Sequence, residues 1–248
     1  MPLLATALGL SLLGSGGGLL VASSLLLFTD RIRTRLVPWL VSYAVGALLG
    51  VALLLLLPEA LETLKPVQVF ATVLSGIIVF FVLEKVLLLR HCHTDECHVH
   101  RATATLVIVG DAFHNFIDGA TVCAALLSSV SLGVNTAIAV AAHEIPQEVG
   151  DVAILLAAGY SRRRALLLNV VSGASGLAGA IVAYAAVGAL PGIRPSVLAF
   201  SSAGLLYIAM SDLIPDLHRG QIDRSAARQV LLIVSGIVSV VFVERLTG

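Results

Sequence analysis

Apolar stretches of about 20 residues, separated by short polar gaps, follow one another along the whole chain. A helix that crosses the hydrocarbon core of a bilayer needs a stretch of this length. Eight stretches qualify, with approximate bounds 3–28, 37–57, 67–89, 102–130, 132–158, 163–188, 196–215 and 226–244. The pattern predicts an all-α, polytopic membrane bundle of about eight transmembrane helices, in a single domain over residues 1–248.

Basic residues divide unequally between alternate gaps. Of the fifteen Lys and Arg residues, eleven lie in the gaps after the first, third, fifth and seventh stretches, and three lie on the opposite side. Cytoplasmic connections carry the excess of Lys and Arg in membrane proteins. The asymmetry therefore predicts that these gaps face the cytosol and that both termini face outside.

Composition agrees with a membrane protein. The 248 residues are 58% hydrophobic and 12% charged, whereas soluble domains carry about 25% charged residues. The net charge of zero supplies no basic field for nucleic acid. The three cysteines do not make a secreted disulfide framework. The start lacks the basic residues of a signal peptide, so we interpret it as the first spanning helix. We expect a lipid environment and no nucleic-acid partner.

Polar residues gather in the fourth and fifth stretches. Spacings of three and four place four of them on one face of the fourth helix. Two adjacent stripes of the fifth helix carry the others. The residues are Asp111, His114, Asn115 and Asp118 in the fourth helix, and His143, Glu144, Gln147, Glu148 and Asp151 in the fifth.

These carboxylates have no basic partner nearby, since residues 102–158 contain no Lys or Arg. A charge at the bilayer centre costs at least about 2.5–3.5 kcal/mol. Either protons or a cation must offset the like charges. Imidazole together with carboxylate suits a borderline divalent metal such as Zn²⁺. Pro146 leaves the carbonyl of Ala142 without its helical partner, which is tolerated at membrane depth where it lines a cavity or site.

The segments HNFIDG (114–119) and HEIPQEVGD (143–151) resemble the paired signatures of the ZIP family of divalent-metal transporters. They are most similar to the subfamily with a long HEXPHEXGD signature. LLPEALE in the second helix and LLYIAMSDLIPDL in the seventh extend the resemblance. The resemblance implies that metal ligands fall on His114, Asn115, Asp118, His143, Glu144 and Gln147.

The resemblance also implies the activity. It would be import of divalent metal into the cytosol, above all Zn²⁺, with Cd²⁺, Fe²⁺, Mn²⁺ and Co²⁺ as other candidate substrates. Helices one, four, five and six would slide as one body against the rest, in elevator fashion. Short connections favour a bacterial cell (inner) membrane. A homodimer is left open.

Some positions depart from the family pattern. Neutral Gln147 stands where the subfamily usually has His, and Gly176 stands where some members place a Glu that helps a second metal. Val51 and Leu55 replace an Asp and a His that many members have in the second helix. We therefore expect one tightly bound ion at the central site. Glu148 is turned about 100° around the helix from Gln147, so its side chain would reach the central site only if Pro146 distorts the helix.

Two alternatives compete with a transporter. An intramembrane metalloprotease uses His-Glu-x-x-His to hold Zn²⁺ and activate water. His143 and Glu144 begin that motif, but Gln147 replaces its second His, so we disfavour an enzyme. A metal sensor or assembly factor would need an output domain or a partner surface, which the short gaps do not provide.

Further candidate ligands lie near the ends of the helices. The connection over residues 90–101 is rich in His and Cys, as expected of a cytosolic metal collector. Glu59 is a candidate for the metal entrance, and Asp212 and His218 are candidates for the exit. The ligands of the connection would be His91, Cys92, His93, Cys97, His98 and His100.

Overall fold

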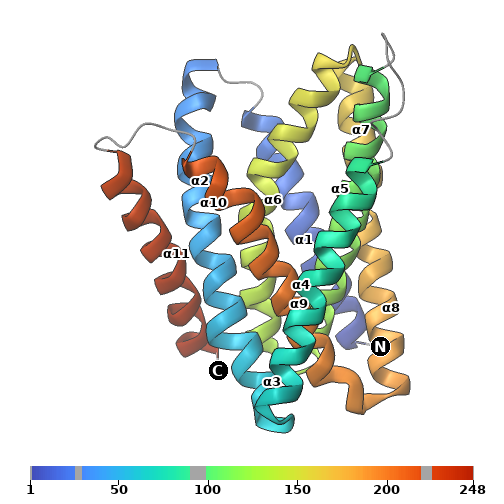
Figure 1. Cartoon of the computed structure of the whole chain (residues 1–248), viewed down its shortest axis with the longest axis vertical. Coiled ribbons are helices and arrows are strands. Elements are labelled where there is room, and N and C mark those ends of the chain that lie inside the picture. The colour runs from blue at the N-terminus through green and yellow to red at the C-terminus, as the bar shows by residue number, and fades with distance from the viewer. Residues whose placement is uncertain (1, 26–29, 90–98, 219–224, 248) are drawn as a thin grey trace.

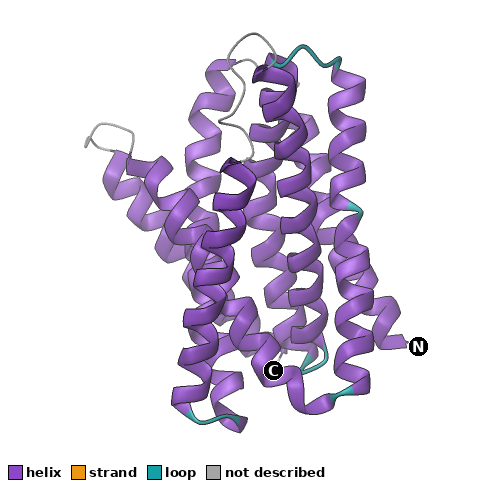
Figure 2. Ribbon diagram, turned by 45° about the vertical axis from the view of Figure 1, so that its right-hand side comes forward, coloured by secondary structure: helices purple, strands orange, loops and turns teal. Residues whose placement is uncertain are grey.

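The computed structural model describes residues 2–25, 30–89, 99–218 and 225–247 (Figure 1). These residues are helical almost throughout and form no strand (Figure 2), which confirms the predicted all-α membrane bundle. The elements are α1 (Pro2–Leu25), α2 (Asp30–Gly50), η1 (Val51–Leu56), α3 (Leu57–Thr63), α4 (Pro66–Leu89), α5 (Val99–Leu126), α6 (Val130–Ala157), α7 (Arg162–Gly173), α8 (Ser175–Ala189), η2 (Pro191–Ile193), α9 (Arg194–Tyr207), η3 (Ile208–Leu213), α10 (Ile214–His218) and α11 (Ser225–Thr247).

Several of these elements join end to end. A π-helical segment, η1, links α2 to α3, and a second one, η3, links α9 to α10. Only Ala174 separates α7 from α8. The described residues therefore form eight long helical segments, which follow the eight predicted stretches in order. π-Helical turns within α-helices occur frequently at functional sites. The segment η3 borders the cavity described below.

Six of the eight segments are long and apolar enough to cross a membrane. The other two, α5 and α6, carry the polar residues that the sequence places in the fourth and fifth stretches. The number of spans, eight, stays a prediction. Large apolar side chains on α4 and α11 are exposed, including Val67, Phe70, Leu231 and Phe242. Such surfaces are expected where helices face lipid rather than water.

The two ends of the bundle differ. One end, here called the basic end, holds the helix ends that flank the four Arg-containing connections. They are the ends of α1, α4, α6 and α10 and the starts of α2, α5, α7 and α11. The opposite end, here called the terminal end, holds the start of α1 and the end of α11 (Figure 1). Both termini thus lie at the same end of the bundle.

Glycines bring some helices unusually close together. Helices α5 and α8 pack extensively on each other, as do α1 and α6. A Cβ atom on Gly119 would lie 1.9 Å from the carbonyl oxygen of Gly176, and one on Gly179 would lie 1.8 Å from that of Phe116. A Cβ on Gly18 of α1 would lie 2.8 Å from the Cβ of Glu144. Small residues permit this backbone contact between membrane helices.

Candidate metal site

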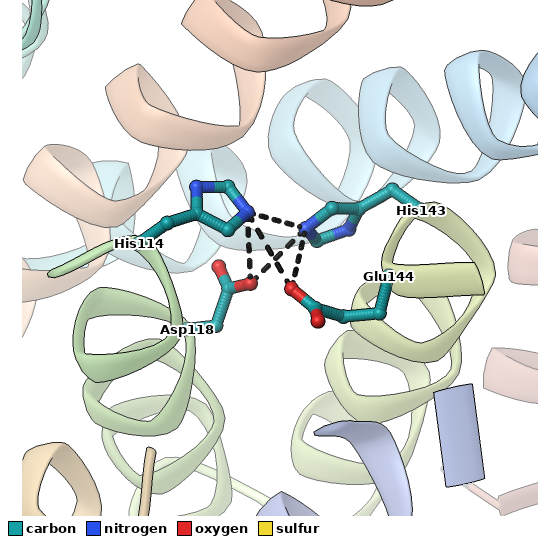
Figure 3. A group of neighbouring side chains, drawn as sticks. All are labelled: His114, Asp118, His143 and Glu144. Atoms are coloured by element: carbon teal, nitrogen blue, oxygen red, sulfur yellow. Dashed lines mark hydrogen bonds and ion pairs between the residues drawn. The ribbon is translucent and has the colours of Figure 1, made fainter. Parts of the chain in front are cut away.

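The central polar residues come from the middle of two adjacent helices. His114 and Asp118 lie one turn apart on α5, and His143 and Glu144 lie near the midpoint of α6. Helices α5 and α6 pack on each other, so the two pairs face one another across the interface (Figure 3). Pro146 lies within α6, which nevertheless runs unbroken from Val130 to Ala157.

One atom from each of the four side chains points toward a common centre (Figure 3). The Nε2 atoms of His114 and His143 are 3.0 Å apart. The carboxylate oxygen Oδ2 of Asp118 lies 3.4 Å from Nε2 of His114 and 3.0 Å from Nε2 of His143. The corresponding distances from Oε1 of Glu144 are 3.6 and 3.7 Å. We call these four residues the histidine site.

These separations match a tetrahedral metal site. Zinc binds imidazole nitrogen and carboxylate oxygen at about 2.0–2.2 Å, so ligand atoms at the corners of a regular tetrahedron are about 3.4 Å apart. Five of the six separations among the four atoms are given above, and they lie between 3.0 and 3.7 Å. The four side chains could therefore hold a four-coordinate metal ion.

The tautomer of His143 directs a lone pair into this centre. Its Nδ1 lies 3.1 Å from the backbone carbonyl oxygen of Ala139. A carbonyl only accepts, so Nδ1–H donates, and in the neutral ring Nε2 keeps its lone pair for a metal ion. Without a metal ion, Nε2 donates to Oδ2 of Asp118 at 3.0 Å only when the ring is protonated. The bond to Ala139 is the outer contact that typically orients a metal-binding histidine. Lone pairs and carboxylates that converge in this way repel one another unless a cation or a proton lies between them.

Burial makes that repulsion costly. His143, Asp118 and Glu144 are each 1% exposed or less. Neither carboxylate oxygen of Glu144 has a hydrogen-bond partner. An unpaired ionic group in a medium of low dielectric constant costs several kcal/mol. Since residues 102–158 contain no Lys or Arg, a metal ion would offset this cost.

The other residues expected as ligands occupy different places. Asn115 is fully buried, and its amide donates to Oδ1 of Asp111 at 2.9 Å. The amide of Gln147 donates to the same oxygen at 3.1 Å. Glu148 is fully buried, and its carboxylate gathers with those of Asp111 and Glu144. None of these three residues belongs to the histidine site, so their role as ligands stays a prediction.

A cavity of about 700 Å³ leads from this region toward the basic end. Its wall includes Asp111 and His114 near the centre, and Val37, Glu84 and Asp212 closer to the basic end. Glu84 accepts a hydrogen bond from the hydroxyl of Tyr207 within this wall. His114 keeps 19% of its side chain exposed. The cavity therefore reaches the histidine site at His114, and its wall extends to residues closer to the basic end.

The predicted entrance and exit residues are only partly connected with this cavity. Asp212 is in its wall, whereas His218 is exposed at the end of α10 and is not part of the wall. Glu59 lies toward the terminal end, where its carboxylate accepts a hydrogen bond from Ser128. The expected ligands His91, Cys92, His93, Cys97 and His98 lie outside the described residues. His100 is in the first turn of α5, but its side chain is also outside what the structure describes.

Two buried residues near the site were not among the ligands predicted from the sequence. Asp111 appeared among the polar residues of the fourth helix but was not chosen as a ligand; it accepts from Asn115, Gln147 and Ser172. Asn169 on α7 is fully buried and was overlooked. The sequence did offer a signal for Asn169, because it is the single polar residue in the apolar run ALLLNVV (165–171), and polar residues within membrane helices are often functional.

Known zinc transporters are similar to this chain over much of its length. Residues 88–244 match the family model described as ZIP Zinc transporter. The zinc transporter ZIP13 of Pongo abelii is 36% identical over 219 residues, which cover 82% of this chain and 65% of that protein. Human ZIP13 is 31% identical over 82% of this chain and 69% of its own length.

Human zinc transporter ZIP4 is 46% identical over 110 residues, which cover 44% of this chain. The chain thus spans about two thirds of the length of ZIP13 and only 17% of that of ZIP4. The family model nevertheless covers the cavity wall from Gly110 onward and the whole histidine site. On this evidence the chain belongs to the ZIP family of zinc transporters.

Proposed function

We propose that this protein carries Zn²⁺ across a membrane and that the histidine site is where the ion is held during transport. The observation that carries the proposal is the tetrahedral set of His114, Asp118, His143 and Glu144, at the middle of two membrane-embedded helices. An ion that enters loses its water shell. Two imidazole nitrogens and two carboxylate oxygens replace that shell with ligands that zinc prefers.

The geometry supports a carrier rather than a protease. Water activation by Zn²⁺ requires an open coordination position beside a general base. In this site Glu144, the residue that would be the base, supplies one of the four converging atoms. Gln147, in place of the second His of the protease motif, donates to Asp111 instead. Family membership agrees, because the relatives are described as transporters.

The direction of transport follows from the cavity and the basic residues. The basic end faces the cytosol by the positive-inside rule, and the cavity reaches the histidine site from this end. The ion therefore leaves toward the cytosol in the conformation described here. At the terminal end, Glu244 of α11 accepts hydrogen bonds from Ser131 and Asn135 of α6 at 2.6 and 3.0 Å. Such contacts close the opposite side.

An elevator movement fits the packing of the helices. Helices α1, α5, α6, α7 and α8 pack on one another, while α2 packs on α11 and α4 packs on α9. Movement of the first group against the second would carry the histidine site from one side to the other. Cross-contacts such as the hydrogen bond of 3.0 Å between Thr121 and Ser201 would break and reform.

Flux into sealed vesicles tests the proposed function. The purified chain is reconstituted into liposomes that contain a fluorescent zinc indicator, and Zn²⁺ is added outside. Saturable entry, absent from liposomes without protein, is the expected result. Cleavage of a membrane peptide without entry of Zn²⁺ would point to the protease, and neither activity would leave only a sensor or assembly factor.

A further inference from the structure

The cavity that reaches the histidine site has a mainly apolar wall. Its volume is about 700 Å³, and pockets for small organic ligands measure about 300–1,000 Å³ and are apolar with a few polar groups. The wall includes Val41 of α2, Leu83 of α4, and Phe113 and Ile117 of α5. Such side chains offer nothing to water or to a metal ion, since both need polar partners. The apolar surface therefore suits a second kind of occupant.

The charge along this wall is of one sign. Among the described residues of the wall there are four acids and no Lys or Arg. Lys85 follows one of these acids on α4, but its ammonium group lies over the ring of Phe81, 5.8 Å from the centroid, and neither residue is part of the wall. A cleft lined by negative charge attracts cations and repels anions. The four acids are Glu84, Asp111, Asp151 and Asp212.

Two of the acids lie beside a pair of aromatic rings. The hydroxyl of Tyr207 donates a hydrogen bond to Glu84, and the carboxylate of Asp212 lies within electrostatic range of the same hydroxyl. The rings of Phe80 and Tyr207 stack, with centroids 6.1 Å apart and planes at 28°. All four residues are part of the wall. Aromatic rings next to carboxylates are the groups that recognise an ammonium ion. We call these four residues the ammonium pocket.

The ammonium pocket lies on the side of the cavity that is nearer the basic end. Its residues come from the second half of α4, the last residue of α9 and the segment η3, all of which run toward that end. Ile117 lies deeper, because α5 runs in the opposite direction. A molecule with its charged head in the ammonium pocket would therefore direct an apolar chain inward along Leu83, Phe113 and Ile117, past His114.

We propose that this cavity binds a cationic amphiphile, an ammonium ion that carries an apolar chain. The head would lie in the ammonium pocket and the chain would lie against the apolar wall. One side of the cavity belongs to α5 and α6, and the other belongs to α2, α4 and α9. These are helices from the two groups that the elevator movement would slide against each other. A molecule lodged between them would hold them in place and block the exit of Zn²⁺, so the amphiphile would act as an inhibitor.

Binding of radiolabelled n-octyltrimethylammonium tests the site. The full-length chain is placed in lipid nanodiscs, and empty nanodiscs give the background. A single saturable site per chain is expected. Unlabelled n-octyltrimethylammonium should compete. Tetramethylammonium, which lacks the chain, and octanoate, which has the opposite charge, should not compete at the same concentration. Absence of saturable binding, or equal competition by octanoate, overturns the proposal.

Two variants with matched controls locate the site. Leu83→Trp fills the apolar part of the cavity and should abolish binding. Val82→Trp is its control, since Val82 is the neighbouring residue on α4 but is exposed and outside the wall. Glu84→Gln together with Asp212→Asn should weaken binding roughly tenfold, as expected for the loss of two exposed ion pairs. Glu62→Gln removes an exposed acid at the terminal end and should leave binding unchanged.

Equal binding by Leu83→Trp and Val82→Trp, or by the double variant and Glu62→Gln, overturns the site. The double variant changes only exposed side chains, so it tests the proposal even if Leu83→Trp fails to fold.

Entry of Zn²⁺ into liposomes is an independent readout. At a concentration that leaves empty liposomes sealed, n-octyltrimethylammonium on both sides should slow saturable entry through the unmodified chain, and tetramethylammonium should not. Entry at the full rate with the site occupied overturns the inhibition. The binding assay does not depend on transport. Saturable binding by a chain that carries no Zn²⁺ without the amphiphile would therefore overturn the proposed function and support the amphiphile site.

Discussion

His114 and His143 are 29 positions apart in the sequence, yet their Nε2 atoms lie 3.0 Å from each other. Nδ1 of His143 donates to the backbone carbonyl of Ala139, so in the neutral ring Nε2 is the nitrogen left free to bind a metal ion. The rings meet edge to face, with their planes at 88°. The two rings also face the carboxylates of Asp118 and Glu144, an arrangement that agrees with the proposed shared ion.

Zinc X-ray absorption should report this arrangement directly. For the purified chain with one equivalent of Zn²⁺, we expect two imidazole nitrogens and two carboxylate oxygens at about 2.0–2.2 Å. His114→Ala should remove one nitrogen from the shell. A shell made of oxygen alone in the unmodified protein would mean that zinc binds elsewhere.

Much of the fold was accessible from the sequence because apolar length is a strong signal. The eight predicted stretches agree in order with eight helical segments among the described residues, and the all-α bundle is confirmed. The local departures from α-helical geometry could not be predicted from the sequence. The π-helical segments over Val51–Leu56 and Ile208–Leu213 depend on packing with neighbouring helices, which no pattern within one helix encodes.

The site was accessible in part. Spacing placed His114 with Asp118 on one face of α5, and the absence of basic residues indicated a cation. Spacing did not reveal which stripe of α6 meets that face. Asn169 was missed, because its burial among the residues of the site depends on how α7 packs on its neighbours.

The contact between α5 and α8 should be sensitive to a single methyl group. Gly119→Ala would place a Cβ against the backbone of Gly176, which cannot yield as a flexible side chain does. We expect a loss of about 1–3 kcal/mol, as for an overpacked core, visible as a lower melting temperature in detergent. Gly188→Ala on α8 meets nothing within 4 Å and should melt like the unmodified protein. Equal melting of both variants would contradict the packing.

The hydrogen bonds of Glu244 to Ser131 and Asn135 should hold the terminal end closed. Hydrogen bonds to a charged group contribute about 1.5–3 kcal/mol each, so Glu244→Leu should raise the open population roughly tenfold or more. Cysteine at buried Ala139, in a chain without its three native cysteines, reports opening through reaction with an impermeant reagent added outside. An unchanged reaction rate would show that these bonds do not close that end.

The orientation in the membrane is tested by cysteines at exposed positions of the two ends. Glu62 and Arg163 are both exposed and lie at the terminal and basic ends. In the cysteine-free chain, Glu62→Cys should react with an impermeant reagent on intact cells. Arg163→Cys should react only after the cells are opened. The reverse pattern would invert the topology and, with it, the direction of transport.

The most direct measurement is the rate of saturable Zn²⁺ entry into liposomes that contain the His143→Ala protein. His143 supplies a ligand and fixes the orientation of the site through Ala139. Its removal should therefore cost more than the roughly 10–100-fold that loss of an outer contact causes. The rate should fall to that of empty liposomes, while Thr136→Val, equally buried on the same helix, should keep the rate of the unmodified chain. Near-normal entry of Zn²⁺ through His143→Ala, with equal protein in the vesicles, would contradict the histidine site as the place where the ion is carried.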